Sequence, residues 1–161
     1  HPCGCCKSAA SDSSSGTMKS LAHRALGSLV ALLGVFGSVS LHASSGDVVV
    51  SLSQATVSFS GQSYPALIGE HTRPGIFPLT HARVLARGYG GDVLAWGARP
   101  DGTPLAIHRV WTLSPKQRRI ERIRGPVAGR QGITGGCVNV MPDVYQLLVD
   151  CCSNGTVVIV P

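Results

Sequence analysis

Residues 134–161 read TGGCVNVMPDVYQLLVDCCSNGTVVIVP and contain the signals of a turn, a helix and a strand in that order. Pro142 suits the first turn of a helix, and Val144, Leu147 and Leu148 recur at the i, i+3 and i+4 spacing of one helical face. Polar and small residues from 150 to 155 end this pattern, and TVVIVP is typical of a buried strand. The sequence therefore predicts one short helix between a glycine turn and a last strand.

Upstream, short apolar or alternating runs predict further strands. These runs are DVVVSL (47–52), ATVSFS (55–60), ARVLAR (82–87), DVLAWG (92–97) and PLAIHRVW (104–111). The segments GQSYP, GYGGD and RPDGTP separate them, and their Gly, Pro and Asp residues favour turns. We therefore predict a mainly β fold.

Composition agrees with a loop-rich β domain. The chain has 161 residues, enough for one ordinary domain, with 14% charged residues and 20 glycines. Its formal net charge of +6 favours anionic partners in general, without choosing among them.

Residues 18–45 have the layout of a secretory signal. Lys19 and Arg24 precede an uncharged run from Ala25 to Leu41, and small residues follow it. We predict cleavage that leaves a mature start near Gly46, with membrane contact limited to this segment. The rival interpretation is an uncleaved anchor, but 17 residues diluted by glycine and serine fall short of the ~20 apolar residues that span a bilayer.

Residues 1–17, HPCGCCKSAASDSSSGT, precede the methionine of that signal, and we expect a disordered leader outside the working protein. Its histidine and three cysteines are types that bind soft metals. CGCC lacks the paired spacing of a zinc finger and has no partner cluster downstream, so we predict no metal site and no cofactor. The working domain is then residues 46–161.

Cys137 follows two glycines and precedes the predicted helix. Small neighbours leave a sulfur accessible, and unpaired N–H groups near a helix start lower the pKa of a thiol. The N–H groups of Gly135, Gly136 and Cys137 could also hold an oxyanion. The alternative is a small buried residue that closes a tight turn.

His108 lies within a predicted strand, where a rigid backbone suits a base that activates a thiol. If it has that role, one ring nitrogen should lie near hydrogen-bond reach of the Cys137 sulfur and the other should meet a backbone carbonyl. The alternative is a surface histidine on an edge strand. His71 and His81 flank PGIFPLT, whose turn residues make a fixed geometry less favourable.

Four segments in this order resemble the catalytic core of the YkuD-like L,D-transpeptidases: AIHRVW (106–111), TGGCVNV (134–140), PDVYQLLV (142–149) and GTVVIVP (155–161). HTRPGIFPL (71–79) is similar to the TPTGxF segment of the family, more loosely, and the whole likeness runs from Tyr64 to Pro161. The resemblance implies a β-sandwich or curved mixed sheet with a short helix after the catalytic cysteine.

The same resemblance implies roles for single residues. Cys137 matches the acylated nucleophile and His108 the histidine that activates it. Thr134 matches the Ser or Thr three residues before the cysteine, and Asn139 the Asn or Arg two residues after it. This chain departs from the family at Gly135, where a histidine is common, and in a longer His108 to Cys137 separation, which contains the basic segment 114–130.

For function, the resemblance implies an exported acyltransferase of the periplasm or cell envelope that acts on peptidoglycan stem tetrapeptides. Its cysteine releases the terminal D-alanine, and the amine of a second stem resolves the acyl-enzyme into a 3→3 cross-link. If water resolves the acyl-enzyme instead, the same site is an L,D-carboxypeptidase. The alternative from another class is a non-catalytic β domain that binds cell wall.

Basic residues dominate the predicted domain, with eleven against seven acidic ones, and five of them gather between Lys116 and Arg124. They form either a solvated face or a docking surface for anionic wall polymer, and Arg130 is a further candidate for stem carboxylates. The export signal and the lack of interleaved aromatic residues argue against nucleic acid.

Cys151 and Cys152 are adjacent at the end of the predicted helix. An oxidising compartment permits a disulfide. We expect two partly buried thiols rather than a bridge between neighbours.

Overall fold

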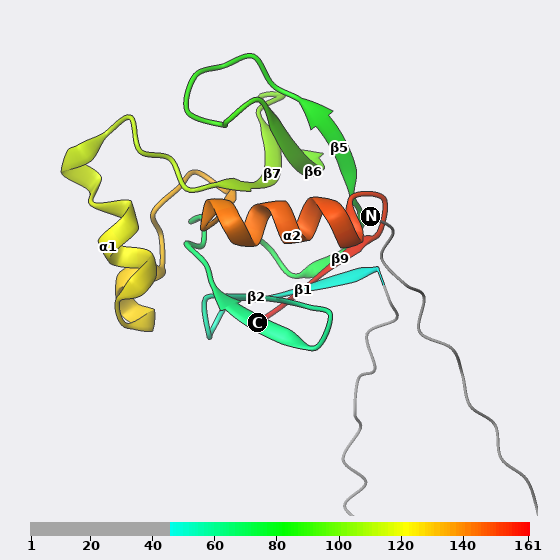
Figure 1. The fold of residues 1–161 in the computed structure, drawn as a ribbon, viewed down its shortest axis with the longest axis horizontal. Coiled ribbons are helices and arrows are strands. Elements are labelled where there is room, and N and C mark those ends of the chain that lie inside the picture. The colour runs from blue at the N-terminus through cyan, green and yellow to red at the C-terminus, as the bar shows by residue number, and fades with distance from the viewer. Residues whose placement is uncertain (1–45) are drawn as a thin grey trace, which may run out of the picture. The chain divides into compact units, whose positions relative to one another are not determined.

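Two mixed β-sheets make up most of the computed structural model, which describes residues 46–161 (Figure 1). The first has the order β3-β2-β1-β9-β4 and the second β5-β6-β7-β8. The prediction of a mainly β fold is confirmed. The predicted leader and signal segment lie outside the described residues. In residues 46–161 no helix is long and apolar enough to cross a membrane.

The strands have the following bounds: β1 Asp47–Ser51, β2 Thr56–Phe59, β3 Gln62–Pro65, β4 Gly75–Pro78, β5 Thr80–Arg83, β6 Asp92–Ala98, β7 Pro104–Arg109, β8 Val138–Val140 and β9 Thr156–Val160. The helical elements are η1 Pro115–Gln117, α1 Arg119–Arg124, η2 Val127–Arg130 and α2 Pro142–Cys152.

In the first sheet, β1 and β9 pair in parallel, so the first and last strands of the described segment are neighbours. Both strands alternate buried and half-buried residues, as expected for strands with one covered face. Val48, Val50, Val157 and Ile159 form the buried row and are at most 2% exposed.

In the second sheet, β5, β6 and β7 form an antiparallel meander, and β8 joins β7 in parallel. Parallel neighbours need a long connection. Here η1, α1 and η2 lie within that connection, between β7 and β8. Figure 1 shows them to one side of the sheets.

Helix α2 lies between the two sheets in Figure 1, and its inner residues belong to the core that both sheets share. Pro142 stands in its first turn, as the sequence predicts. Val144, Tyr145, Leu148 and Cys152 are its buried residues.

Helix α1 buries a single residue, Ile123, which packs with Leu67 and Val110 in a small second cluster. Its other side chains are exposed or half-buried. The basic segment is thus attached to the domain by one apolar contact face, and most of its charges face solvent.

Three strands were missed by the sequence analysis. β3 was interpreted as the turn GQSYP, β4 lies in the proline-rich PGIFPLT, and β8 is only three residues long. The predicted strand ARVLAR is also wrong in extent, because β5 ends at Arg83. Pro65 and Pro78 close β3 and β4, which are the two outer strands of their sheet, and an edge tolerates proline because one side of the strand needs no partner.

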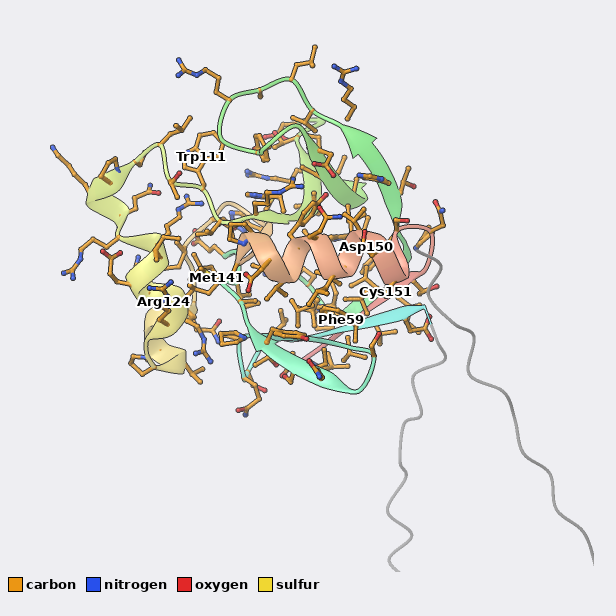
Figure 2. All side chains as sticks on the ribbon, in the orientation of Figure 1. Phe59, Trp111, Arg124, Met141, Asp150 and Cys151 are labelled. Atoms are coloured by element: carbon orange, nitrogen blue, oxygen red, sulfur yellow. A yellow bond between two sulfur atoms is a disulfide. The ribbon has the colours of Figure 1, made fainter. Side chains whose placement is uncertain are left out.

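The expectation of two free thiols at the end of α2 is also wrong. Cys151 and Cys152 are joined by a disulfide, with Cα atoms 3.7 Å apart. Cys152 faces the core and Cys151 faces solvent, at the end of α2 where Figure 2 labels it. Among the described residues Cys137 is therefore the one free cysteine.

Adjacent leucines of α2 provide a matched test of this packing. Leu148 is fully buried, whereas Leu147 is 48% exposed. We predict that Leu148→Ala lowers the free energy of unfolding by about 2–5 kcal/mol, because it leaves a cavity between the sheets. Leu147→Ala should change it by about 0.5 kcal/mol or less. Urea unfolding measures both, and equal losses would contradict this orientation of α2.

Candidate active site

The parallel pairing of β7 with β8 assembles the candidate site. Its register sets Ile107 opposite Val138 and His108 opposite Asn139. Cys137 directly precedes β8 and so continues the line of β8 beside the middle of β7. His108 and Cys137, which are 29 positions apart in the chain, are thereby brought to neighbouring positions.

His108 is 3% exposed, and both of its ring nitrogens are engaged. Nδ1 lies 2.7 Å from the carbonyl oxygen of Arg109, which only a protonated nitrogen can bond. Nε2 lies 3.1 Å from the side-chain amide nitrogen of Asn139 and accepts its N–H. The ring is therefore neutral, with its proton on Nδ1. Burial lowers the pKa of His108 to about 4, although the bond to Arg109 opposes this shift.

Arg109, whose carbonyl oxygen bonds His108, is fixed through its side chain. The Arg109 guanidinium lies 2.6 Å from Asp92 and over the ring of Tyr145 on α2, 4.1 Å from its centroid. His81 also bonds Asp92, at 2.6 Å. Partial burial raises the pKa of Asp92, but bonds from His81 and Arg109 outweigh it and leave that pKa below its ordinary value. This cluster ties β5, β6, β7 and α2 together beside the site.

The Cys137 thiol is half-buried and donates to the carbonyl oxygen of Pro104, 3.5 Å away. Burial raises the pKa of Cys137, and the N–H of Ala106 with the charges of Arg119 and Arg99 only partly offsets this. The sequence analysis expected a lowered pKa from a helix start next to the cysteine. That expectation is wrong, because β8 intervenes and α2 begins only at Pro142.

Of the two hydrogen bonds expected for His108, the structure contains one. One nitrogen of His108 meets a backbone carbonyl, as predicted. The other bonds Asn139 instead of Cys137. In residues 46–161 no hydrogen bond joins the imidazole to the sulfur.

The turn before Cys137 is held by Thr134. Its hydroxyl donates to the carbonyl oxygen of Cys137 and accepts the N–H of Gly136 at 3.3 Å. Gly136 has a φ of +152° and touches Gly69, where an added Cβ would lie 2.4 Å from the Gly136 Cα. The Thr72 hydroxyl bonds the Gly136 carbonyl oxygen at 2.8 Å. Two facing glycines thus allow the segment around residue 70 to lie against this turn.

Asn139 is fully buried and connects His108 to helix α1. Its side-chain oxygen accepts a bond from Arg119 at 2.8 Å, which turns the amide nitrogen towards His108. Arg119 also bonds Gln117 at 2.7 Å. Through Arg119 the basic segment therefore orients this amide, and the orientation keeps the imidazole neutral.

One aromatic ring covers the imidazole and is itself supported by a second. Tyr89, from the loop between β5 and β6, makes edge contacts with His108 and Trp111, with ring centroids 4.7 and 5.1 Å apart. Gly88 lies against the Trp111 ring, where a Cβ would stand 2.9 Å from it. Burial raises the pKa of Tyr89, as does the neighbouring Cys137.

Cys137 and His108 open onto a common cavity of about 420 Å³. Its walls are Tyr89, Arg99, Thr103, Pro104, Leu105, His108, Trp111, Ser114, Gln117, Arg119, Ile133, Thr134, Gly135, Gly136 and Cys137. Two of these residues are arginines and none is acidic. Within residues 46–161 no group of His, Cys, Asp and Glu is arranged to hold a metal ion.

Of the residues singled out from the sequence, Cys137, His108, Thr134, Gly135 and Gly136 line this cavity, and Asn139 lies behind it. Arg130 does not line it. Its guanidinium is buried and bonds the carbonyl oxygens of Gly125 and Gln54, at 2.8 and 3.0 Å, which fastens η2 to the first sheet's loop.

Sequence reasoning did not single out Arg99, Arg119 or Tyr89. Arg99 and Tyr89 lie in segments interpreted as turns, and Arg119 is one of five clustered basic residues. A tyrosine between glycines in GYGGD is the strongest missed signal, because a large ring in a turn is free to cover a neighbouring site.

No family model matches the chain, and no curated protein matches it. Solved structures similar to it include an L,D-transpeptidase from Mycobacterium smegmatis, at 22% identity over 71% of this chain and 58% of that one, with a TM-score of 0.46. Another is an L,D-transpeptidase from Stackebrandtia nassauensis, at 20% identity over 80% and 62%, with a TM-score of 0.47. L,D-transpeptidase 1 from Mycobacterium tuberculosis matches at 20% identity over 71% and 58%, with a TM-score of 0.42. The chain therefore covers about three fifths of these structures. At TM-scores below 0.5 such likenesses establish no function. The argument for function therefore rests on the geometry of the site.

The neutrality of His108 can be measured directly. By nitrogen-15 NMR we predict that its ring keeps the Nδ1–H tautomer well below pH 6 and gains its second proton only near the pKa of about 4. The unfolded ring titrates near 6.5, so unfolding takes up a proton between these values. The free energy of unfolding should therefore fall by ~1–3 kcal/mol as pH drops through this window. His108→Gln should lack this component, and a His108 titration near pH 6.5 would contradict the burial argument.

Proposed function

We propose that residues 46–161 form a cysteine acyltransferase that acts on peptidoglycan stem tetrapeptides as a 3→3 cross-linking L,D-transpeptidase. Cys137 is its nucleophile and His108 its base. The observation that carries the proposal is the cavity onto which a free thiol and a neutral imidazole both open, with their strands held in register. The AIHRVW and TGGCVNV motifs, which resemble the family, contain these two residues.

The first step transfers an acyl group to Cys137. His108 takes the thiol proton, and the sulfur attacks the carbonyl carbon of the third stem residue. The amide bond to the terminal D-alanine then breaks, and the imidazolium returns the proton to the departing amine. The product is a thioester on Cys137.

This step requires the thiol to exchange its bond to the Pro104 carbonyl for one to Nε2 of His108. Asn139 now occupies that nitrogen, at 3.1 Å. Catalytic hydrogen bonds often tighten only once substrate is bound. A substrate that fills the cavity would displace the resting contact of the thiol, while the bond from Nδ1 to Arg109 keeps the ring oriented.

The glycine turn supplies candidates for the oxyanion hole. The N–H of Gly136 already donates to Thr134, so we assign the role to the N–H groups of Gly135 and Cys137. Gly135 has no Cβ to obstruct the approach of a carbonyl oxygen.

In the second step, the side-chain amine of another stem attacks the thioester, forms the 3→3 amide bond and frees Cys137. The Tyr89 ring against His108 limits the approach of water to the imidazole, which favours the amine over hydrolysis. If water attacks instead, the same acyl-enzyme makes the domain an L,D-carboxypeptidase, which product analysis distinguishes.

We place this activity in the cell envelope, where the predicted export signal would deliver the domain. Four exposed basic residues suit contact with anionic wall polymer: Lys116 on η1, Arg118 between η1 and α1, and Arg122 and Arg124 on α1. The competing function is a non-catalytic cell-wall-binding domain. The raised pKa of Cys137 is the observation that favours it, because a neutral thiol is a poor nucleophile.

Acylation by imipenem separates the two functions. A structure of the L,D-transpeptidase LdtMt1 holds this carbapenem, so it is a suitable probe. We predict that the intact mass of the domain increases by one imipenem and that Cys137→Ala abolishes the increase without loss of fold, since a small residue in this turn fills little core volume. A domain that stays unmodified under saturating imipenem would favour the binding function.

His108→Gln should slow this acylation by at least ~10²-fold, the scale of a positioned general base. His81→Gln is the matched control, because His81 bonds Asp92 on β6 and does not line the cavity. Its acylation rate should stay within a few-fold of the unmodified domain. Equal rates for both variants would remove His108 from the mechanism.

The disulfide gives a further test. Replacing Cys151 and Cys152 together by Ser should leave turnover within a few-fold of normal, because neither residue lines the cavity. Release of D-alanine from a tetrapeptide measures this. Complete loss of turnover in a variant that keeps its unfolding midpoint would mean that the end of α2 shapes the site.

A further inference from the structure

Arg99 is a cavity residue whose charge has no hydrogen-bond or salt-bridge partner in the described part of the chain. It follows β6 and opens the turn to β7. Its N–H donates to the carbonyl oxygen of Thr103 at 2.8 Å, and its own carbonyl oxygen accepts from Gly102 at 2.9 Å. The hairpin therefore fixes the backbone of Arg99 while the guanidinium is left available.

The other arginine of the cavity is different. Arg119 donates hydrogen bonds to Gln117 and Asn139. Asp101, near Arg99 in the same turn, accepts the N–H of Thr103 at 2.9 Å. That bond, more than the Arg99 charge, lowers the pKa of Asp101. No acidic residue lines the cavity, and Arg99 is the arginine there whose guanidinium has no hydrogen-bond partner among the described residues.

Gly135 leaves room for this guanidinium. A Cβ at position 135 would lie 3.1 Å from Nη1 of Arg99, closer than ordinary van der Waals contact. The Arg99 charge also acts on the Cys137 sulfur, whose pKa it helps to lower against burial. Arg99 thus lies against the glycine turn, near enough to Cys137 for its charge to act on the sulfur.

We propose that Arg99 binds the carboxylate of the substrate residue that departs in the first step. This rests on the proposed function. In a peptide cleaved before its last residue, three bonds separate the reacting carbonyl carbon from the terminal carboxylate carbon, a span of less than ~5 Å. A carboxylate so close to the sulfur is the terminal one, and a guanidinium is the side chain that binds it in a planar, two-bonded manner. The cavity then selects peptides that end one residue beyond the scissile bond.

Binding to an inactive domain tests this independently of turnover. In the Cys137→Ala chain, the affinities of a stem tetrapeptide and of the same peptide with a C-terminal carboxamide are measured by calorimetry. We expect the acid to bind about 10- to 100-fold more tightly, as a lost charge-assisted pair implies. Adding Arg99→Ala should reduce the acid to the affinity of the amide, and Arg99→Lys should retain part of the preference.

Arg83→Ala is the control for net charge, because Arg83 is exposed on β5 and does not line the cavity. It should leave the preference for the acid unchanged. Equal binding of acid and amide, no binding of the acid, or a preference that survives Arg99→Ala would each overturn the assignment. Failure of the proposed reaction is a separate result, in which the unmodified domain releases no D-alanine although the Arg99-dependent preference is present.

Discussion

The parallel pairing of β7 with β8 is the constraint on which the rest of the site depends. β8 has only three residues, and it gains its second partner from Leu67, which exchanges backbone hydrogen bonds of 2.9 Å with Asn139 in both directions. Held from both sides, the strand fixes Asn139 beside His108 and Cys137 beside the N–H of Ala106. The long connection through α1 is required by this parallel pairing, so the Arg119 that orients Asn139 is a product of the same topology.

Burial, more than any charge, sets the resting chemistry. It lowers the pKa of His108 and raises the pKa of Cys137, so both groups are neutral near pH 7. A neutral pair has no permanent ion pair to desolvate, and the imidazole keeps a lone pair able to accept a proton. In the proposed reaction such a thiol would become reactive only when its proton is transferred, which would link activation to substrate binding.

The parts that the sequence predicts are those whose signals are local. Helix α2 begins at Pro142 and follows the spacing of Val144 and Leu148, and β7 was found as an apolar run bounded by turn residues. β8 was missed because three residues show no period, and β4 because two prolines in PGIFPLT suggest turns. Cys137 and His108 were candidates through their chemistry and through the resemblance of the motifs around them. Their pKa shifts, and the approach of Arg99 and Arg119, depend on burial and on contacts between distant segments, which no local pattern contains.

The two arginines of the cavity, Arg119 and Arg99, differ in role because they lie on different elements. Arg119 lies on helix α1 and donates hydrogen bonds to Gln117 and Asn139. It acts on the His108 imidazole indirectly, by orienting the side-chain amide of Asn139. Arg99 comes from a hairpin turn that fixes its backbone only, and glycine at position 135 gives its guanidinium space. A Cβ at position 135 would lie close to that guanidinium, so the glycine at 135 and the position of Arg99 depend on each other. The turn between β6 and β7 thereby places a cationic group near Cys137.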